Sequence, residues 1–146
     1  MRPDRYVVLG DVAFECDRLD ETVSILNEVG AGGVYGNHDI GLARPVGTYS
    51  LRYSRQVRDY FRSLDSSLEI ASYLFMHGAP WWDPTTSLDC YLAEKPHQLS
   101  RLLPYLETCA HNVVFTAHLH CWRISSAGGA IDWHGEHEIH LAFDKK

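Results

Sequence analysis

The chain has 146 residues, of which 45% are hydrophobic and 22% are charged, and its net charge is -6 at pH 7. This length and composition are typical of a single globular domain, so we expect one domain over residues 1–146. The acidic balance argues against broad binding to nucleic acids or to anionic membranes, because both need patches of Lys and Arg.

The cysteines and the hydropathy pattern indicate the compartment. Four cysteines stand at positions 16, 90, 109 and 121, without a CxxC pair. They are most simply reduced thiols. The chain shows neither the apolar core of a signal peptide nor an apolar stretch of about 18 residues or more. We therefore expect a cytoplasmic protein without membrane contact.

Four short apolar runs predict strands, and each is followed by residues of types that bind metals. The runs span residues 6–10, 33–35, 73–76 and 113–115. The residues that follow them are Asp11, Asn37, His77 and the pair His118 and His120. Because helical patterns separate the runs, we expect an α/β fold with a mostly parallel, buried sheet. Ligands bind beyond the carboxyl ends of such strands, so these side chains are expected to form a metal site.

Two amphipathic patterns predict helices in the first half of the chain. Apolar residues at helical spacing between positions 19 and 29 predict a helix, with Asp20 as its N-cap and Gly30 as its stop. A second stripe over 57–64 predicts a helix that packs on the sheet through its apolar face. The first pattern, with the strands on both sides, forms a strand, helix, strand unit.

The second half of the chain predicts one more helix and a terminal hairpin. The helix begins near Pro96, and we expect Pro104 to kink it or to divide it into two shorter turns. After His120, apolar residues alternate with a Gly128-Gly129 turn signal. This pattern is typical of an antiparallel hairpin or meander.

The tetrapeptide Gly36-Asn37-His38-Asp39 carries most of the chemical specificity. Asn37 offers a neutral oxygen ligand, His38 can act as an acid or electrophile, and Asp39 can orient that imidazole. By itself the tetrapeptide is also consistent with a simple turn, because Gly and Asn favour turns and Asp often caps the element that follows.

The other candidate ligands also have structural alternatives. Asp11 can bridge two cations about 3.5 to 4 Å apart, but a strand-ending Asp is often only a cap. A lone His77 is more often a hydrogen-bonded structural residue. The spacing of His118 and His120 is more specific, because both can face one cleft if a ligand holds the turn, or share one face of an extended strand.

Trp81 and Trp82 follow His77 closely and are expected on the rim of the cleft. Their aromatic faces can bind substrate by stacking on a base or an aryl leaving group. The alternative is that they cover the loop against the core.

The ordered motifs resemble those of the calcineurin-like metallophosphoesterases, especially the small bacterial and archaeal phosphodiesterase-type members. The motifs are Gly10-Asp11, the tetrapeptide 36–39, His77-Gly78 and His118-x-His120, and the match covers about residues 4 to 123. The resemblance implies a layered α-β-β-α fold, with a mixed sheet, flanking helices and a C-terminal hairpin. It also implies hydrolysis of phosphodiesters or phosphomonoesters by a metal-bound hydroxide.

The resemblance also implies a role for each site residue. Asp11 would bridge two metals, while Asn37, His77 and His118 would complete one site and His120 would bind the other. His38 would be the proton donor, with Asp39 as its partner. The implied cofactors are divalent ions, Mn²⁺ first, with Fe, Co²⁺, Zn²⁺ or Ni²⁺ as alternatives and one or two ions per chain.

The chain departs from the family pattern at three points. Family members begin with a strand that ends in Asp-x-His and is followed by a helix, whereas only five residues precede Tyr6. We therefore expect this strand and helix to be missing, which leaves the second metal with only Asp11 and His120 as protein ligands. Phe14 stands at the spacing of a second family Asp, and Ala117 replaces a usual Gly.

These departures keep alternatives to an active enzyme open. The chain is expected to hydrolyse a small phosphorylated substrate or nucleotide. The alternatives are a catalytically impaired protein that binds metal or regulates, and an interaction module of the same descent. A fragment, a misassigned start, or a homo-oligomer that covers the exposed sheet edge would each account for the missing strand.

Overall fold

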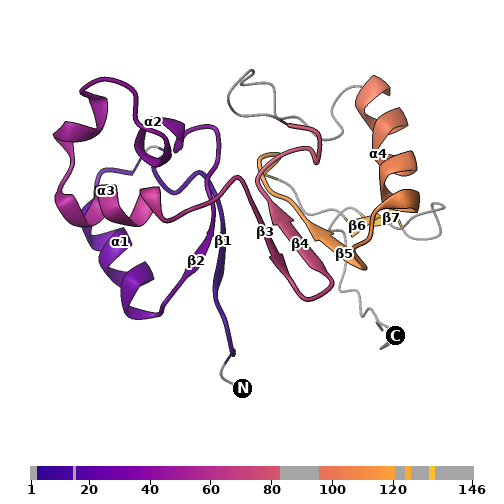
Figure 1. Ribbon diagram of the computed structural model, residues 1–146, viewed down its shortest axis with the longest axis horizontal. Coiled ribbons are helices and arrows are strands. Elements are labelled where there is room, and N and C mark those ends of the chain that lie inside the picture. Colours follow the sequence, from indigo (N-terminus) through magenta and orange to yellow (C-terminus); the bar gives the residue numbers. More distant parts are fainter. Residues whose placement is uncertain (1–2, 15, 83–95, 121–123, 126–131, 134–146) are drawn as a thin grey trace.

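The computed structural model describes residues 3–14, 16–82, 96–120, 124–125 and 132–133. Its fold is mixed α/β. Figure 1 shows helices α1, α2 and α3 grouped beyond strands β1 and β2, while α4 lies beyond strand β5. No helix in this described part of the chain is long and apolar enough to cross a membrane.

The first unit is the predicted strand, helix, strand. Strands β1 (Val7–Leu9) and β2 (Gly32–Val34) pair in parallel, with helix α1 (Leu19–Glu28) between them in sequence. Gly30 follows the helix at φ 67°, so its predicted role as a stop is confirmed. The prediction of Asp20 as the N-cap is wrong, because burial of Leu19 places the helix start earlier, with Arg18 as the cap. Asp20 lies in the first turn instead.

The second sheet is mixed rather than mostly parallel. Strand β4 (Tyr73–Met76) pairs antiparallel with β3 (Ser67–Ile70) and parallel with β5 (Val113–Phe115). β3 was not predicted, because it alternates exposed polar and half-buried apolar residues over only four positions. The backbone of Asp65 connects the two sheets, since Tyr35 N donates to its carbonyl at 3.0 Å and its own N–H donates to Gly33 O at 3.2 Å.

The expected full burial of the sheet is wrong for its outer strands. Positions within β2 and β4 are buried, whereas β1 is half-buried throughout and β5 is half-buried to exposed. In the described structure β1 pairs only with β2, and β5 only with β4. Strands at such edges have less cover than central strands.

The helical side of the molecule holds the main core. Helix α2 (Ile40–Ala43) and the 3₁₀ turn Tyr49–Arg52 precede helix α3 (Arg55–Arg62), whose N-cap Ser54 accepts a hydrogen bond from Val57 N at 3.2 Å. The predicted apolar stripe of α3 is buried, but it packs mainly on α1 and α2 rather than on the sheet as expected. The buried core cluster comprises Leu19, Val23, Tyr35, Leu42, Ala43, Val57, Tyr60, Phe61 and Leu64.

The last described elements are a helix and two short strands. Helix α4 (Pro96–Thr108) runs without interruption through Pro104. Of the two expected alternatives, division into two shorter turns is therefore wrong, and a kink at Pro104 stays a prediction. Strands β6 (Ile124–Ser125) and β7 (Asp132–Trp133) pair antiparallel, as expected of a terminal hairpin. Cys16 and Cys109 are free thiols, as predicted, and Cys90 and Cys121 lie outside the described residues.

Candidate metal centre

The loops that follow β1 and β2 cross at two glycines. Gly10 has φ 90°, and a Cβ there would overlap the backbone nitrogen of Gly36 and lie 2.7 Å from Nδ1 of His77. A Cβ on Gly36 would in turn overlap the Asp11 carboxylate. Only glycine permits this approach. The crossing places Asp11, from the first loop, beside the tetrapeptide 36–39, from the second.

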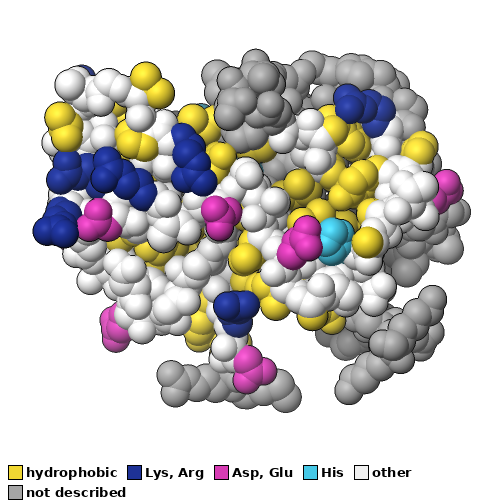
Figure 2. All heavy atoms as spheres, in the orientation of Figure 1, with side chains coloured by type: hydrophobic (Ala, Val, Ile, Leu, Met, Phe, Trp, Pro, Cys, Tyr) yellow, Lys and Arg dark blue, Asp and Glu magenta, His cyan; other side chains and the backbone are white. Residues whose placement is uncertain are grey.

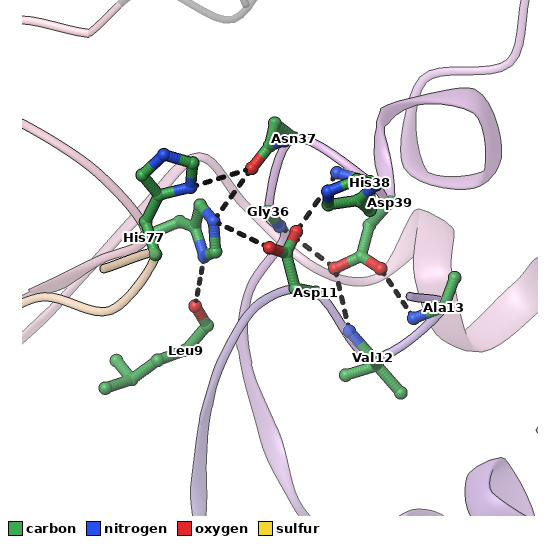
Figure 3. Close-up of polar contacts among 10 residues, drawn as sticks. Leu9, Asp11, Val12, Ala13, Gly36, Asn37, His38, Asp39 and His77 are labelled. Carbon is green, nitrogen blue, oxygen red and sulfur yellow. Dashed lines mark hydrogen bonds and ion pairs between the residues drawn. The ribbon is translucent and has the colours of Figure 1, made fainter. Parts of the chain in front are cut away.

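His77 is the buried centre of the site. Its Nδ1 lies 2.7 Å from the carbonyl oxygen of Leu9, and its Nε2 lies 3.2 Å from Oδ2 of Asp11 and 3.0 Å from Oδ1 of Asn37 (Figure 3). A carbonyl can only accept a hydrogen bond, so Nδ1 carries a proton and donates it. When Nε2 is also protonated it donates to the Asp11 and Asn37 oxygens, and in the neutral imidazole it presents its lone pair towards them and can bind a cation. This is the tautomer and the orientation of a metal-binding histidine.

His118 completes the cluster from the loop after β5. Its Nδ1 lies 3.1 Å from Oδ1 of Asn37, and its ring packs edge-on against His77 with 5.2 Å between centroids. The loop is held in place because Ala117 N donates to the His77 carbonyl at 2.9 Å. The carboxyl ends of β1, β2, β4 and β5 therefore converge, as predicted.

The donor atoms of this cluster fit a divalent cation. One ligand atom each of Asp11, His77 and His118 lies within 4.8 Å of the others, and Oδ1 of Asn37 lies close to both imidazoles. Lone pairs at such distances repel one another unless a cation or a shared proton lies among them. This set of carboxylate, amide and imidazole ligands could therefore hold a metal ion.

The Asp11 carboxylate is set up to be ionised. Burial raises the pKa of Asp11. The hydrogen bond with His77, the backbone hydrogen bond from His38 and the charges of the two histidines lower this pKa by more, so it lies below its usual value. His38 N donates to Oδ1 of Asp11 at 3.0 Å, while Oδ2 faces His77. One oxygen of the carboxylate is thus fixed by the backbone and the other is directed into the cluster.

Asp39 is fully buried, and its contacts differ from those that its predicted role requires. Its Oδ1 accepts a hydrogen bond from Ala13 N at 2.9 Å, and its Oδ2 accepts from Gly36 N at 2.9 Å and Val12 N at 3.4 Å. Burial raises the pKa of Asp39, and Asp11 adds to this, while the backbone N–H groups oppose it. Among the described contacts, Asp39 connects the two crossing loops rather than orienting the imidazole of His38.

His38 and His120 lie on the exposed side of the cluster, beside Phe14. The His38 ring packs on Phe14 with centroids 4.2 Å apart, and the His120 ring lies 6.2 Å from Phe14. His120 is not part of the cluster of Asp11, His77 and His118. The structure therefore brings together one of the two expected ligand sets, while His120 stands apart from it.

The two tryptophans have different surroundings. Trp81 lies against helix α4, with the Arg101 guanidinium 4.4 Å above its ring and the Tyr105 ring 6.5 Å away. The Trp82 ring lies 6.2 Å from His77. Trp81 thus fits the covering role that the sequence left open, and only Trp82 is placed next to the metal cluster.

Three candidate ligands have positive φ, a backbone conformation that is uncommon outside glycine, although Asp and His adopt it more often than most residues. Asp11, His118 and His120 have φ values of 57°, 71° and 51°, and Ala71 is the only other non-glycine residue with positive φ in the described structure. Left-handed residues cost about 1 to 3 kcal/mol each and cluster at functional sites. Three of the four such residues here are candidate ligands.

Two features of the site were not predicted. The Leu9 carbonyl, which fixes the tautomer of His77, leaves no signal in a sequence because every residue has a carbonyl. Phe14 was noted only as a departure from the family spacing.

Comparisons with protein-family models, with curated proteins and with solved structures find no match to this chain. Its function is therefore inferred from the site.

Proposed function

We propose that this chain is a metal-dependent phosphoesterase of the calcineurin-like metallophosphoesterase type, acting on a small phosphorylated molecule or nucleotide in the cytoplasm. The observation that carries this proposal is the convergence of Asp11, Asn37, His77 and His118 from four strand ends. The order of these residues along the chain, together with His38 next to Asn37, matches the family motifs. The parallel strands and flanking helices are consistent with part of a layered α-β-β-α fold.

The chain's own residues divide the work of hydrolysis. Asp11, Asn37, His77 and His118 hold the cation, with Mn²⁺ as the first candidate. When bound, such an ion neutralises phosphate oxygens and lowers the pKa of water. A water oxygen forms a bond to phosphorus and releases one proton to the solvent as the bond to the leaving oxygen breaks, and the solvent afterwards restores the proton that His38 gives up. His38, which is exposed beside Asp11, gives its proton to that leaving oxygen.

A second candidate function is metal binding without turnover. The observation that favours it is the position of His120, which is exposed and outside the ligand cluster. A protein with one cation site and no second ion would keep the affinity of the cluster for metal. It would lose much of the stabilisation that two ions give to the attacking and leaving oxygens of an in-line displacement.

The test is hydrolysis of bis(p-nitrophenyl) phosphate with and without Mn²⁺. We expect turnover that depends on Mn²⁺ and that falls at least 100-fold in both Asn37→Ala and His38→Ala. His111→Ala is the matched control, because His111 precedes β5 at the end opposite to His118 and pairs with Glu69 at 3.4 Å. Mn²⁺ binding without turnover would establish the second candidate, and turnover that persists in Asn37→Ala would refute the proposed site.

A further inference from the structure

Phe14 is an exposed aromatic residue at the edge of the metal cluster. It closes the turn that begins at Asp11, since Phe14 N donates to the Asp11 carbonyl at 3.3 Å. The residue is 40% exposed and lies outside the buried core cluster. The turn therefore fixes a phenyl ring only three residues from a metal ligand, with much of its surface facing solvent.

The ring of Phe14 lies beside the group that would donate the proton. Its centroid is 4.2 Å from that of His38, with the two planes tilted by 44°, and 6.2 Å from that of His120. Because His38 gives its proton to the leaving oxygen in the proposed reaction, the leaving group has to lie next to His38. At that position it also meets the exposed surface of Phe14.

We propose that Phe14 forms a wall of the leaving-group subsite and selects phosphate esters whose leaving group carries an aromatic ring. This inference rests on the proposed function. Packing of one aromatic ring on another favours binding beyond the contribution of the buried area. An aromatic leaving group would also cover a phenyl surface that is otherwise exposed to water. A purely structural role for Phe14, holding the His38 ring in place, would not discriminate between aromatic and aliphatic groups.

The test uses phenylphosphonate and methylphosphonate, because their carbon–phosphorus bonds resist hydrolysis and binding is measured without turnover. The purified chain is first titrated with Zn²⁺, and each phosphonate is then titrated into the Zn²⁺-loaded protein by calorimetry. We expect phenylphosphonate to bind about three to ten times more tightly than methylphosphonate, from the usual contribution of an aromatic pair. In Phe14→Leu this ratio should fall below about two, and in Phe14→Trp it should be retained.

Phe115→Leu is the matched control, because Phe115 in β5 has nearly the same exposure, 41%, but stacks on Phe75 in β4. Its ratio should equal that of the unmodified chain. Equal binding of the two phosphonates, or a preference for phenylphosphonate that survives in Phe14→Leu, would overturn this inference. If Zn²⁺ binds in the same experiment, the metal centre is still supported. If neither Zn²⁺ nor Mn²⁺ binds, the proposed function and this inference are overturned together.

Discussion

Replacing Gly10 with alanine tests the crossing of the two loops that builds the site. The new Cβ would overlap the backbone nitrogen of Gly36 and lie 2.7 Å from Nδ1 of His77, at a residue with φ 90°. Left-handed strain costs about 1 to 2 kcal/mol, and forced overlap in a packed region adds about 1 to 3 kcal/mol. We therefore expect the free energy of unfolding to fall by about 2 to 5 kcal/mol.

Urea unfolding followed by circular dichroism measures this loss. With a slope of about 1 to 3 kcal/mol/M, the midpoint should fall by about 0.7 M or more. Gly30→Ala is the matched control, because Gly30 has φ 67° but no atom lies within 4 Å of its Cβ position. It should lose only the strain, about 1 kcal/mol after the entropy gain from replacing glycine. Equal losses in the two variants would refute the close approach of the loops.

Two further predictions concern buried polar groups. Asp39→Asn should lower the free energy of unfolding by about 2 to 3 kcal/mol in urea melts, because an amide nitrogen would face the backbone N–H groups of Gly36 or Ala13. The control Asp59→Asn, at an exposed position, should change the free energy of unfolding by less than about 0.5 kcal/mol. Equal effects of the two substitutions would contradict the role of Asp39 in connecting the loops. Tyr60→Phe should raise stability by about 1 kcal/mol at pH 7, because the buried Tyr60 hydroxyl finds no hydrogen-bond partner in the described structure. Burial, with the charge of Asp39, raises the pKa of Tyr60 from 10.0 to about 12, so the folded state binds more protons and stability falls as pH rises from 10 to 12. Urea melts of Tyr60→Phe at pH 8 and 11 should show less of this loss, and an unchanged pH dependence would count against it.

The strand ends could be predicted because burial and chain direction leave a strong pattern in the sequence. A short apolar run followed by a polar residue located all four strand ends within one or two residues. Asp11 lies close to His77, 66 positions away, although their strands belong to two different sheets. Short strands that form only by pairing with a neighbouring strand were harder to predict. The half-exposed strand β3 alternates too briefly to be distinguished from a loop.

The role of a polar side chain depended on contacts that spacing does not reveal. Asp39 follows His38 directly, which favoured a pairing of the two, but its carboxylate accepts from Ala13 and Gly36 N–H instead. The crossing of the loops at Gly10 and Gly36 brings those donors to it. Similarly, Asp20 is a good N-cap by residue type, yet burial of Leu19 determined where the helix begins.

The most direct test of the proposed centre is calorimetric titration of the metal-free protein with Mn²⁺ and Zn²⁺. The convergence of Asp11, Asn37, His77 and His118 predicts one tightly bound ion per chain. Binding should weaken by at least 100-fold in His77→Ala and Asp11→Asn, and remain unchanged in His111→Ala, each variant being checked for cooperative unfolding. If neither ion binds, or if both bind His77→Ala as tightly as the unmodified chain, the cluster is not a metal site.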